Sequence, residues 1–420
     1  MFLETFAKIL LYRFLKMKKI TVLVFLLLTP FLVFSVFPKT QGWYAGDAHL
    51  HTHFGETAWE NPGTFQSTYA RAKNLDYDWL IFTEHSVAFD IGSQNYTQEI
   101  QECTNKNSTQ DQPLCMVGQE LSLYAGSNKQ QHLLAYPKNN YFLEYLDGTC
   151  NDQFQLSNCR DAQETINEVN ELNGMSFIAH PFHQGVEIPV VQDLVIFDWV
   201  SWGTQGVTGL EVFNASDNDG QWSNDDQQAF HKWMGLLLEE TNPQDGFLVG
   251  IANSDAHYST ELGTAFTYCY MDSLTIQNVL NAYKKGHCVL SSGPLIDFSL
   301  NEKRIGKTAF VDEGSQVLSI KLNSNSQYGR LKKLSIIVDG LLEQELPLTG
   351  YSKELEIPIE LENTKKFILL KAETQTGKVG VTNPIWLDFE SEQISPSSDD
   401  CSTILGCFSM FAKKLSTFFS

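Results

Sequence analysis

Positive charge is scarce in this 420-residue sequence, which has 29 lysines and arginines against 50 aspartates and glutamates. The formal net charge is −21 at pH 7. Such acidity repels polyanions and therefore argues against nonspecific binding of nucleic acid or of an anionic membrane surface. A small anionic substrate is not excluded, because bound metal ions can dominate the local field.

Several catalytic and binding motifs are also missing. The sequence has no Cys-x-x-Cys pair of the zinc-ribbon or thioredoxin kind and no Gly-x-Ser-x-Gly elbow of a serine hydrolase. Before Lys307 and Thr308, Asn301 stands where a phosphate-binding loop needs its first glycine. The composition shows no low-complexity block and no internal repeat. Serine-nucleophile and phosphate-loop chemistry therefore find little support.

The eight cysteines are even in number, and in an exported protein those that are close in sequence could form disulfides that staple loops. Cys103 with Cys115 and Cys150 with Cys159 are such pairs. The connectivity does not follow from sequence alone, and free buried thiols are the alternative.

A long apolar run, residues 20–37, follows Lys16, Lys18 and Lys19 near the N-terminus. A basic start followed by an apolar run is typical of an export signal. The run approaches the length of a membrane span and no clear small-x-small cleavage site follows it, so an uncleaved signal-anchor is the alternative. We predict an extracellular or periplasmic protein, or one anchored to a membrane by this segment.

The rest of the chain changes pattern once. Up to Gly293 and Pro294, short β-like runs alternate with helical patterns, which is typical of α/β folds built from βα units in an open sheet or a barrel. The following runs are short, alternating and rich in branched residues, which predicts a small antiparallel β-sandwich. The predicted parts are an export segment (1–38), an α/β domain of βα units (39–296), a β-sandwich (297–390), and a polar linker with an amphipathic tail (391–420).

Residue types that bind metal ions recur where the apolar runs end. The first cluster places His49 and His51 two positions apart, so that on a strand both would point to the same side. The carboxyl ends of the strands of a βα barrel converge on one rim, so the recurrence predicts a polynuclear metal site. Any one of these histidines, taken alone, would more often be structural. The residues at the six strand ends are Asp47, His49, His51 and His53; Glu84 and His85; Glu120; His132; His180; and Asp255 and His257.

The order Asp-x-His-x-His, Thr-Glu-His, Gly-x-Glu, a single His, Ala-His-Pro and Ser-Asp-Ala-His, over roughly residues 43–296, resembles the PHP (polymerase and histidinol phosphatase) family. Residues 286–294, before the β-rich part, resemble its exported carbaryl-hydrolase-like branch. The resemblance implies a distorted (β/α)7 barrel and, usually, phosphoester hydrolysis at two or three divalent metal ions.

The resemblance also implies a ligand set. One metal position takes a further ligand from just after His-x-His, for which Glu56 is the candidate and His53 the competitor. Asp47 is expected to orient a ligand histidine through its other ring nitrogen. Asp47, Glu120 and His257 are the residues expected to serve catalysis. The expected ligands are His49, His51 and Asp255 for one ion; Glu120 bridging to an ion held by His132 and His180; and His85 with His257 for a further ion.

These donors suit zinc, manganese or iron. A metal-bound water has its pKa lowered toward about 7, so hydroxide would be available to attack phosphorus or a carbonyl carbon without a covalent nucleophile. We predict a hydrolase of a small phosphoester. Hydrolysis of a carboxyl ester, carbamate or amide is the alternative, and an exported binding protein with an inactive barrel is an alternative of another class. His183, Trp202 and Asn253 could contact substrate, although each type is more often structural at such positions.

Arginine is the residue that most often grips phosphate through paired hydrogen bonds. After residue 38 the sequence has four arginines: Arg71, Arg160, Arg304 and Arg330. This shortage counts against the phosphoester prediction without excluding it, because metal ions can also bind phosphate oxygens.

Overall fold

The computed structural model describes residues 42–55, 62–86, 94–109, 112–124, 130–142, 146, 161–183, 186–188, 193–195, 199–215, 220–244 and 246–389. The described residues all belong to one structural unit. The predicted export segment and the predicted C-terminal linker and tail lie outside the described residues. Within the described residues, no helix is long and apolar enough to cross a membrane.

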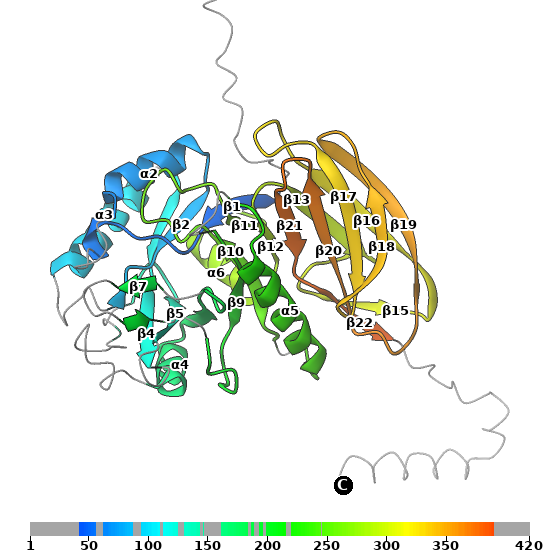
Figure 1. The fold of residues 1–420 in the computed structure, drawn as a ribbon, viewed down its shortest axis with the longest axis horizontal. Coiled ribbons are helices and arrows are strands. Elements are labelled where there is room, and N and C mark those ends of the chain that lie inside the picture. The colour runs from blue at the N-terminus through cyan, green and yellow to red at the C-terminus, as the bar shows by residue number, and fades with distance from the viewer. Residues whose placement is uncertain are drawn as a thin grey trace, which may run out of the picture. The chain divides into compact units, whose positions relative to one another are not determined.

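The N-terminal half of the described chain alternates strands with helices and hairpins (Figure 1). Its elements are β1 (Trp43–Asp47), η1 (His53–Gly55), α2 (Phe65–Asn74), β2 (Trp79–Phe82), α3 (Gln94–Ser108), β3 (Leu114–Val117), β4 (Gln119–Tyr124), β5 (Gln130–Tyr136), α4 (Ala162–Glu171), β6 (Met175–Ile178), β7 (Val186–Ile188), β8 (Asp193–Val195) and β9 (Gly209–Asn214).

The C-terminal half begins with helices and strands and ends in strands alone. Its elements are α5 (Asn224–Glu239), β10 (Val249–Asn253), β11 (Phe266–Tyr270), α6 (Ile276–Lys284), β12 (Cys288–Ser291), β13 (Leu295–Leu300), β14 (Lys303–Arg304), β15 (Thr308–Val311), β16 (Gly314–Asn323), β17 (Leu331–Val338), β18 (Leu341–Pro347), β19 (Ser352–Leu361), β20 (Phe367–Thr374), β21 (Val379–Thr382) and β22 (Ile385–Phe389).

Most strands of the N-terminal half belong to two sheets. One has 11 strands and runs β15-β22-β20-β21-β12-β11-β1-β2-β3, with β17 and β18 attached beside β20. The other has five strands in the order β10-β9-β6-β5-β4. A further four-stranded sheet, β14-β13-β16-β19, lies in the C-terminal part. Because β1 pairs with β11, the large sheet contains strands from both halves of the chain.

The predicted (β/α)7 barrel is wrong. In the part of the chain that the structure describes, the strands form open sheets and predominate over helices, and the two N-terminal sheets meet at the isolated bridges Leu50–Ala256 and His85–Glu120. A barrel needs parallel strands joined by crossover helices, whereas β4–β5, β5–β6, β1–β11 and β11–β12 are antiparallel pairs. Antiparallel neighbours can be joined by short turns and need no crossover helix. The alternation of strand and helix patterns in the sequence therefore did not determine whether the strands close into a barrel.

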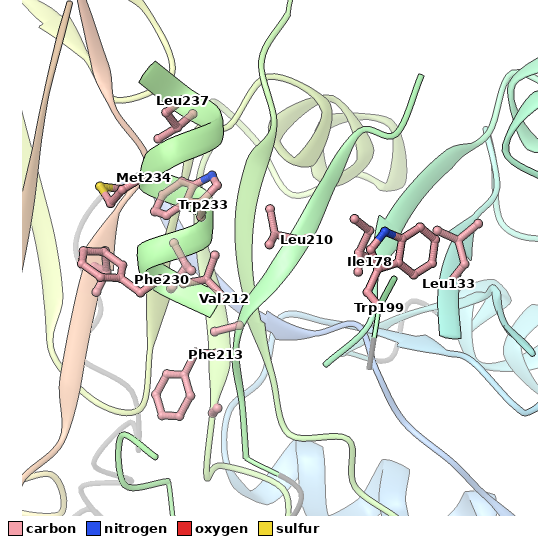
Figure 2. Close-up of a cluster of buried hydrophobic side chains, with 14 of the residues drawn as sticks. Leu133, Ile178, Trp199, Leu210, Val212, Phe213, Phe230, Trp233, Met234 and Leu237 are labelled. Atoms are coloured by element: carbon pink, nitrogen blue, oxygen red, sulfur yellow. The ribbon is translucent and has the colours of Figure 1, made fainter. Parts of the chain in front are cut away.

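Helix α5 shows how the sequence fixes one element. Ser223 and Asp226 form a capping box: the Ser223 side chain accepts from the Asp226 backbone N–H, and Asp226 accepts from the Ser223 backbone N–H in return. Apolar residues then follow at helical spacing. Phe230, Trp233, Met234 and Leu237 of α5 belong to the same buried apolar cluster as Leu210 and Val212 of β9, and Figure 2 shows Trp233 on the side of α5 toward β9.

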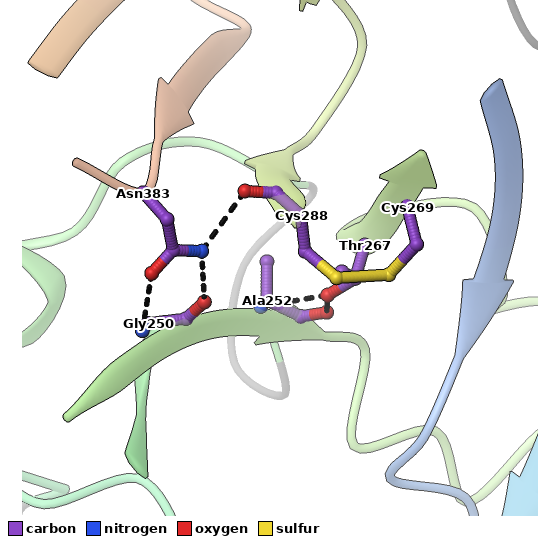
Figure 3. The surroundings of a disulfide bond; sticks show 6 residues. All are labelled: Gly250, Ala252, Thr267, Cys269, Cys288 and Asn383. Atoms are coloured by element: carbon purple, nitrogen blue, oxygen red, sulfur yellow. Dashed lines mark hydrogen bonds between the residues drawn. A yellow bond between two sulfur atoms is a disulfide. The ribbon is translucent and has the colours of Figure 1, made fainter. Parts of the chain in front are cut away.

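Asn383 joins the β-rich part after residue 294 to strands that precede it (Figure 3). Its side chain accepts from the backbone N–H of Gly250 and donates to the backbone oxygens of Gly250 and Cys288, each at 2.9 Å. Asn383 is completely buried, so these bonds satisfy backbone groups that water cannot reach.

Two disulfides lie within the described residues. Cys103 of α3 bonds to Cys115 of β3, which confirms one of the two predicted pairs. Cys269 bonds to Cys288, linking the adjacent antiparallel strands β11 and β12 (Figure 3), and this pair was not predicted. Cys150 and Cys159 lie outside the described residues.

Candidate metal centre

The candidate ligands come from strands of both N-terminal sheets. His49 and His51 follow β1, His85 follows β2 and His180 follows β6; Glu120 lies in β4 and His132 in β5; Asp255 and His257 follow β10. His180 and Asp255 have backbone φ of 22° and 52°, in the left-handed region that is uncommon for residues other than glycine. The chain therefore turns sharply at these two positions, and local strain of this kind is frequent at functional sites.

Glu120 stands at the centre of the cluster. Its Oε1 lies 2.8 Å from His132 Nδ1, 3.0 Å from His180 Nε2 and 3.3 Å from His49 Nε2. Its Oε2 lies 2.8 Å from His85 Nδ1 and 3.4 Å from His51 Nε2. One carboxylate thus faces five imidazoles, with each oxygen turned toward a different group of them.

Asp255 completes the side of the cluster formed by His49 and His51. Its Oδ1 lies 3.3 Å from His49 Nε2 and 3.2 Å from His51 Nε2. His257 is placed next to it, with Nδ1 3.1 Å from the Asp255 backbone oxygen. The rings of His257 and His85 stack on His51, with centroids 4.3 and 4.4 Å away.

Four groups of three residues offer ligand atoms that all lie within 4.8 Å of one another, close enough to share an ion. All eight residues in these groups were predicted as ligands. The groups are His51, His85 and His257; His49, His180 and Asp255; His49, His51 and Glu120; and His85, Glu120 and His132.

The chemistry of these residues fits divalent ions. His49 Nε2, His51 Nε2 and Glu120 Oε2 are buried polar atoms without a hydrogen-bond partner within the described residues, and they face one another. A buried polar atom without a partner costs stability. An ion bound between imidazole nitrogens and carboxylate oxygens would satisfy all three atoms, and such mixed donors suit zinc, manganese or iron.

Burial and neighbouring charges together set the protonation states of Glu120 and His51. Burial acts to raise the pKa of Glu120, but His132, His85 and His49 outweigh it and hold the pKa well below its usual range. Burial, together with His257 and His85, lowers the pKa of His51 to about 3. Glu120 is therefore held as a carboxylate and His51 as a neutral imidazole, which are the forms that bind metal ions.

Glu211 of β9 supports the cluster from behind, and the sequence analysis did not identify it. Its Oε1 lies 3.0 Å from His49 Nδ1 and accepts from Asn253 Nδ2 at 2.7 Å. Its Oε2 accepts from the His180 backbone N–H at 2.9 Å. Holding the Nδ1 proton of His49 directs Nε2 into the cluster. The sequence feature that could have identified Glu211 is that it is the single carboxylate inside the apolar run of residues 209–213, where it is buried.

Asp47 is completely buried and binds backbone N–H groups near the cluster. Its carboxylate accepts from the backbone N–H groups of His49 and Ser254 at 3.3 Å, which ties the chain after β1 to the chain after β10. The ring nitrogen that Asp47 was expected to hold is, for His49, held by Glu211. Burial raises the pKa of Asp47 to about 7.

The remaining predicted residues are distributed around the cluster. His53 lies beside α2, where its Nδ1 accepts from the Phe65 backbone N–H at 3.2 Å, and it belongs to none of the four donor groups. Glu56 lies outside the described residues. Asn253 is buried behind the cluster on Glu211, and the Trp202 ring stacks on Phe182 with centroids 5.7 Å apart.

Comparison with known proteins bears on this region directly. Residues 248–288 match the model of the PHP-associated family (PHP_C). The match supports a PHP-family protein. It spans β10 to the start of β12 and includes Asp255 and His257, whereas assignment to the carbaryl-hydrolase-like branch stays a prediction. Together with the four donor groups, the match is compatible with a metal-dependent hydrolase.

No curated protein matches the chain. Among solved structures, the crystal structure of an engineered protein is similar over 75% of this chain and 50% of that protein, with 10% sequence identity and a TM-score of 0.20. This chain therefore covers half the length of that engineered protein. A likeness at this level carries no argument about fold or function.

Proposed function

We propose that this protein is a metal-dependent hydrolase of the PHP type. The observation that carries the proposal is the position of Glu120, whose two carboxylate oxygens face five buried imidazoles and lie next to Asp255. A carboxylate so placed can bridge neighbouring ions, which is how multinuclear hydrolases hold two metals a few ångströms apart.

The chain's own residues have separable tasks in this proposal. His49, His51 and Asp255 would hold one ion, His132 and His180 a second, and His85 with His257 a further one, with Glu120 shared between them. Divalent ions bound there would supply Lewis acidity, lowering the pKa of water and polarising the scissile group. Zinc, manganese and iron all suit these donors.

His257 is the ligand candidate best placed to handle a proton. Its side chain is 24% exposed, more than those of the other seven. Donation of its Nδ1 proton to the Asp255 backbone oxygen leaves the lone pair on Nε2. That lone pair can bind an ion or accept a proton, but not both at once, so the predicted catalytic role and the ligand role of His257 are alternatives in any one state.

A small pocket lies next to the cluster. Its cavity volume is about 100 Å³, and its lining includes His180 and Glu211 together with His183, Asp225 and Asp226. Because ligand sites commonly measure about 300–1,000 Å³, this pocket would hold only a small group of a substrate. The carboxylates in the pocket lining disfavour a substrate that carries an anionic group beyond the one that would bind the metal ions. The acidic composition of the chain argues against nucleic acid for the same electrostatic reason.

A small phosphoester is the substrate class that we propose first, because the family resemblance favours it. A carboxyl ester, carbamate or amide is the second candidate, and the placement of the arginines favours it. Arg71 is exposed on α2, Arg304 pairs with Asp297, and Arg330 lies over the ring of Tyr351. None of these three lines the cluster, and Arg160 lies outside the described residues, so phosphate would depend on the metal ions for its charge.

An activity screen with metal analysis tests both the proposed metal site and the proposed substrate class. Purified protein should contain at least two transition-metal ions per chain after incubation with zinc or manganese, and Asp255→Asn should contain fewer. An aryl phosphate should be hydrolysed, with inhibition by inorganic phosphate. Turnover of an aryl ester or carbamate, insensitive to phosphate and without aryl-phosphate cleavage, would favour the second substrate class. Protein that binds no metal would contradict the hydrolase proposal.

We also propose that residues 1–38 direct export, with or without cleavage. The apolar run behind three lysines supports this placement, and fractionation of cells that express the full chain would test it.

A further inference from the structure

We infer that Lys371 of β20 is a positioning residue for the pocket beside the metal centre, acting through Trp222. The inference rests on the proposed function and deepens it, because it gives the strands after residue 294 a part in binding substrate. Lys371 and Trp222 belong to none of the four donor groups. Helix α5, whose first turn lines the pocket, stands next to these strands (Figure 1).

The Lys371 side chain holds a cation against two aromatic rings. Its Nζ lies over the ring of Trp222, 4.5 Å from the centroid, and 5.8 Å from the ring centroid of Phe230. The side chain of Lys371 is only 15% exposed, and the Glu373 carboxylate lies 4.0 Å from its Nζ. A cation that is partly removed from water is attracted to an aromatic face more strongly than an exposed one.

Trp222 also has partners on the side of α5 and β9. Its ring meets that of Phe213 edge-on, with centroids 5.2 Å apart, and its Nε1 donates to Gln227 Oε1 at 3.1 Å. The side chain of the preceding residue, Gln221, donates to the backbone oxygen of Thr376 after β20 at 3.3 Å. The strands after residue 294 therefore hold the chain just before α5 at two points.

The residues that follow Trp222 form one wall of the pocket. Ser223 caps α5, and its backbone N–H and hydroxyl both donate to Asp226 Oδ2 at 2.7 Å. Asp226 Oδ1 accepts from the Asn214 backbone N–H at 3.0 Å, and the Asn214 side chain donates to Glu211 Oε2 at 3.0 Å. All four of these residues line the pocket. A displacement of Trp222 would therefore move the wall formed by α5 and disturb its bond to the wall formed by β9.

Such a displacement should affect substrate binding more than the metal ions. Because the cavity measures about 100 Å³, a small movement of one wall would change which group of a substrate it admits. The four donor groups contain no residue of α5, so the ligands do not depend directly on its position. A loss of binding that leaves the reacting centre intact raises KM and leaves kcat unchanged.

Substitution of Lys371 in the full chain, loaded with zinc or manganese, tests this role. Lys371→Met keeps an unbranched stem over the rings and removes the charge. We expect its KM for an aryl phosphate or aryl ester to rise by about fivefold or more, with kcat and metal affinity within about twofold of wild type. Lys371→Arg restores a cation over the rings and should return KM to within about twofold of wild type. Lys332→Met, at an exposed position on β17, is the matched control and should behave as wild type.

A double variant shows whether the two residues act as one unit. Trp222→Leu removes the ring that Lys371 contacts, so it should also raise KM, and the addition of Lys371→Met should raise KM no further. Effects that multiply would overturn the inference. A Lys371→Met variant with a lower Tm and unchanged KM would overturn it as well, because Lys371 would then serve the fold alone.

Hydrogen exchange tests the same contact without a substrate. Backbone amides of residues 221–229 should exchange faster in Lys371→Met than in wild type, and at the wild-type rate in Lys332→Met. Equal exchange in wild type and Lys371→Met would overturn the inference. Wild-type protein that hydrolyses neither an aryl phosphate nor an aryl ester would contradict the proposed function, and the exchange comparison would then decide whether Lys371 positions the pocket wall.

Discussion

Single residues in this protein divide into those that face the cluster and those that hold the ligands in place. Glu211 is the clearest of the second kind, because its carboxylate contacts the ring of His49, the side chain of Asn253 and the backbone of His180. Its negative charge also raises the pKa of His49, against the effect of burial. A residue with three such contacts influences two ligands without touching an ion.

We therefore expect Glu211→Gln to weaken metal binding by about tenfold or more, since a neutral amide holds the His49 Nδ1 proton less strongly. Metal titration of the stripped protein measures the change. Glu239→Gln, an exposed carboxylate at the end of α5, is the control and should leave the affinity unchanged. Wild-type affinity in Glu211→Gln would show that the backbone alone orients His49.

Secondary-structure elements carry the ligands, so the packing of elements sets the geometry of the centre. Helix α5 covers β9, the strand that presents Glu211, through Trp233 and its apolar neighbours (Figure 2). Trp233 is completely buried, and its Nε1 donates to the Leu248 backbone oxygen at 2.7 Å. Leu248 immediately precedes β10, the strand that leads to Asp255.

Trp233→Ala should lower the free energy of unfolding by about 3–5 kcal/mol, because it leaves a large cavity and an unpaired carbonyl. Chemical denaturation monitored by circular dichroism measures the difference. Leu238→Ala, at a partly exposed position on the same helix, should cost less than about 1 kcal/mol. Equal losses for the two variants would mean that α5 is not held by this buried face.

The strands after residue 294 are joined to the rest of the molecule by strand pairing and by Asn383. The sheet that contains β1 and β2 continues through β12 into β21, and Asn383 bonds to the backbone of β10 next to it (Figure 3). The strands after residue 294 contribute no member to the four donor groups within the described residues. Their effect on the centre must therefore pass through the strands that they support.

Asn383→Leu should lower the free energy of unfolding by about 2–4 kcal/mol, since it leaves buried backbone groups of Gly250 and Cys288 without partners. Denaturation of the full chain measures the loss. The exposed Asn281→Leu on α6 is the control and should change stability by less than about 0.5 kcal/mol. A neutral result for Asn383→Leu would mean that strand pairing alone holds the strands after residue 294 to the rest of the molecule.

The sequence by itself determined which residues could form the centre. Histidines and carboxylates that follow apolar runs identified His49, His51, Glu120 and Asp255 without knowledge of the sheet, because a strand end predicts where its next side chains emerge. Glu211 escaped this reasoning, since it lies inside a strand, where one buried charge has no local partner to reveal it.

Tertiary structure alone decided how the strands pair and which side chains support the ligands. Local periodicity records whether a segment suits a strand or a helix, but it does not record the direction of its neighbour. The chain therefore forms mixed open sheets where a closed parallel barrel was predicted. Glu211 contacts His49 across more than 160 residues of sequence. Contacts of that range exist only once the sheets have brought their ends together.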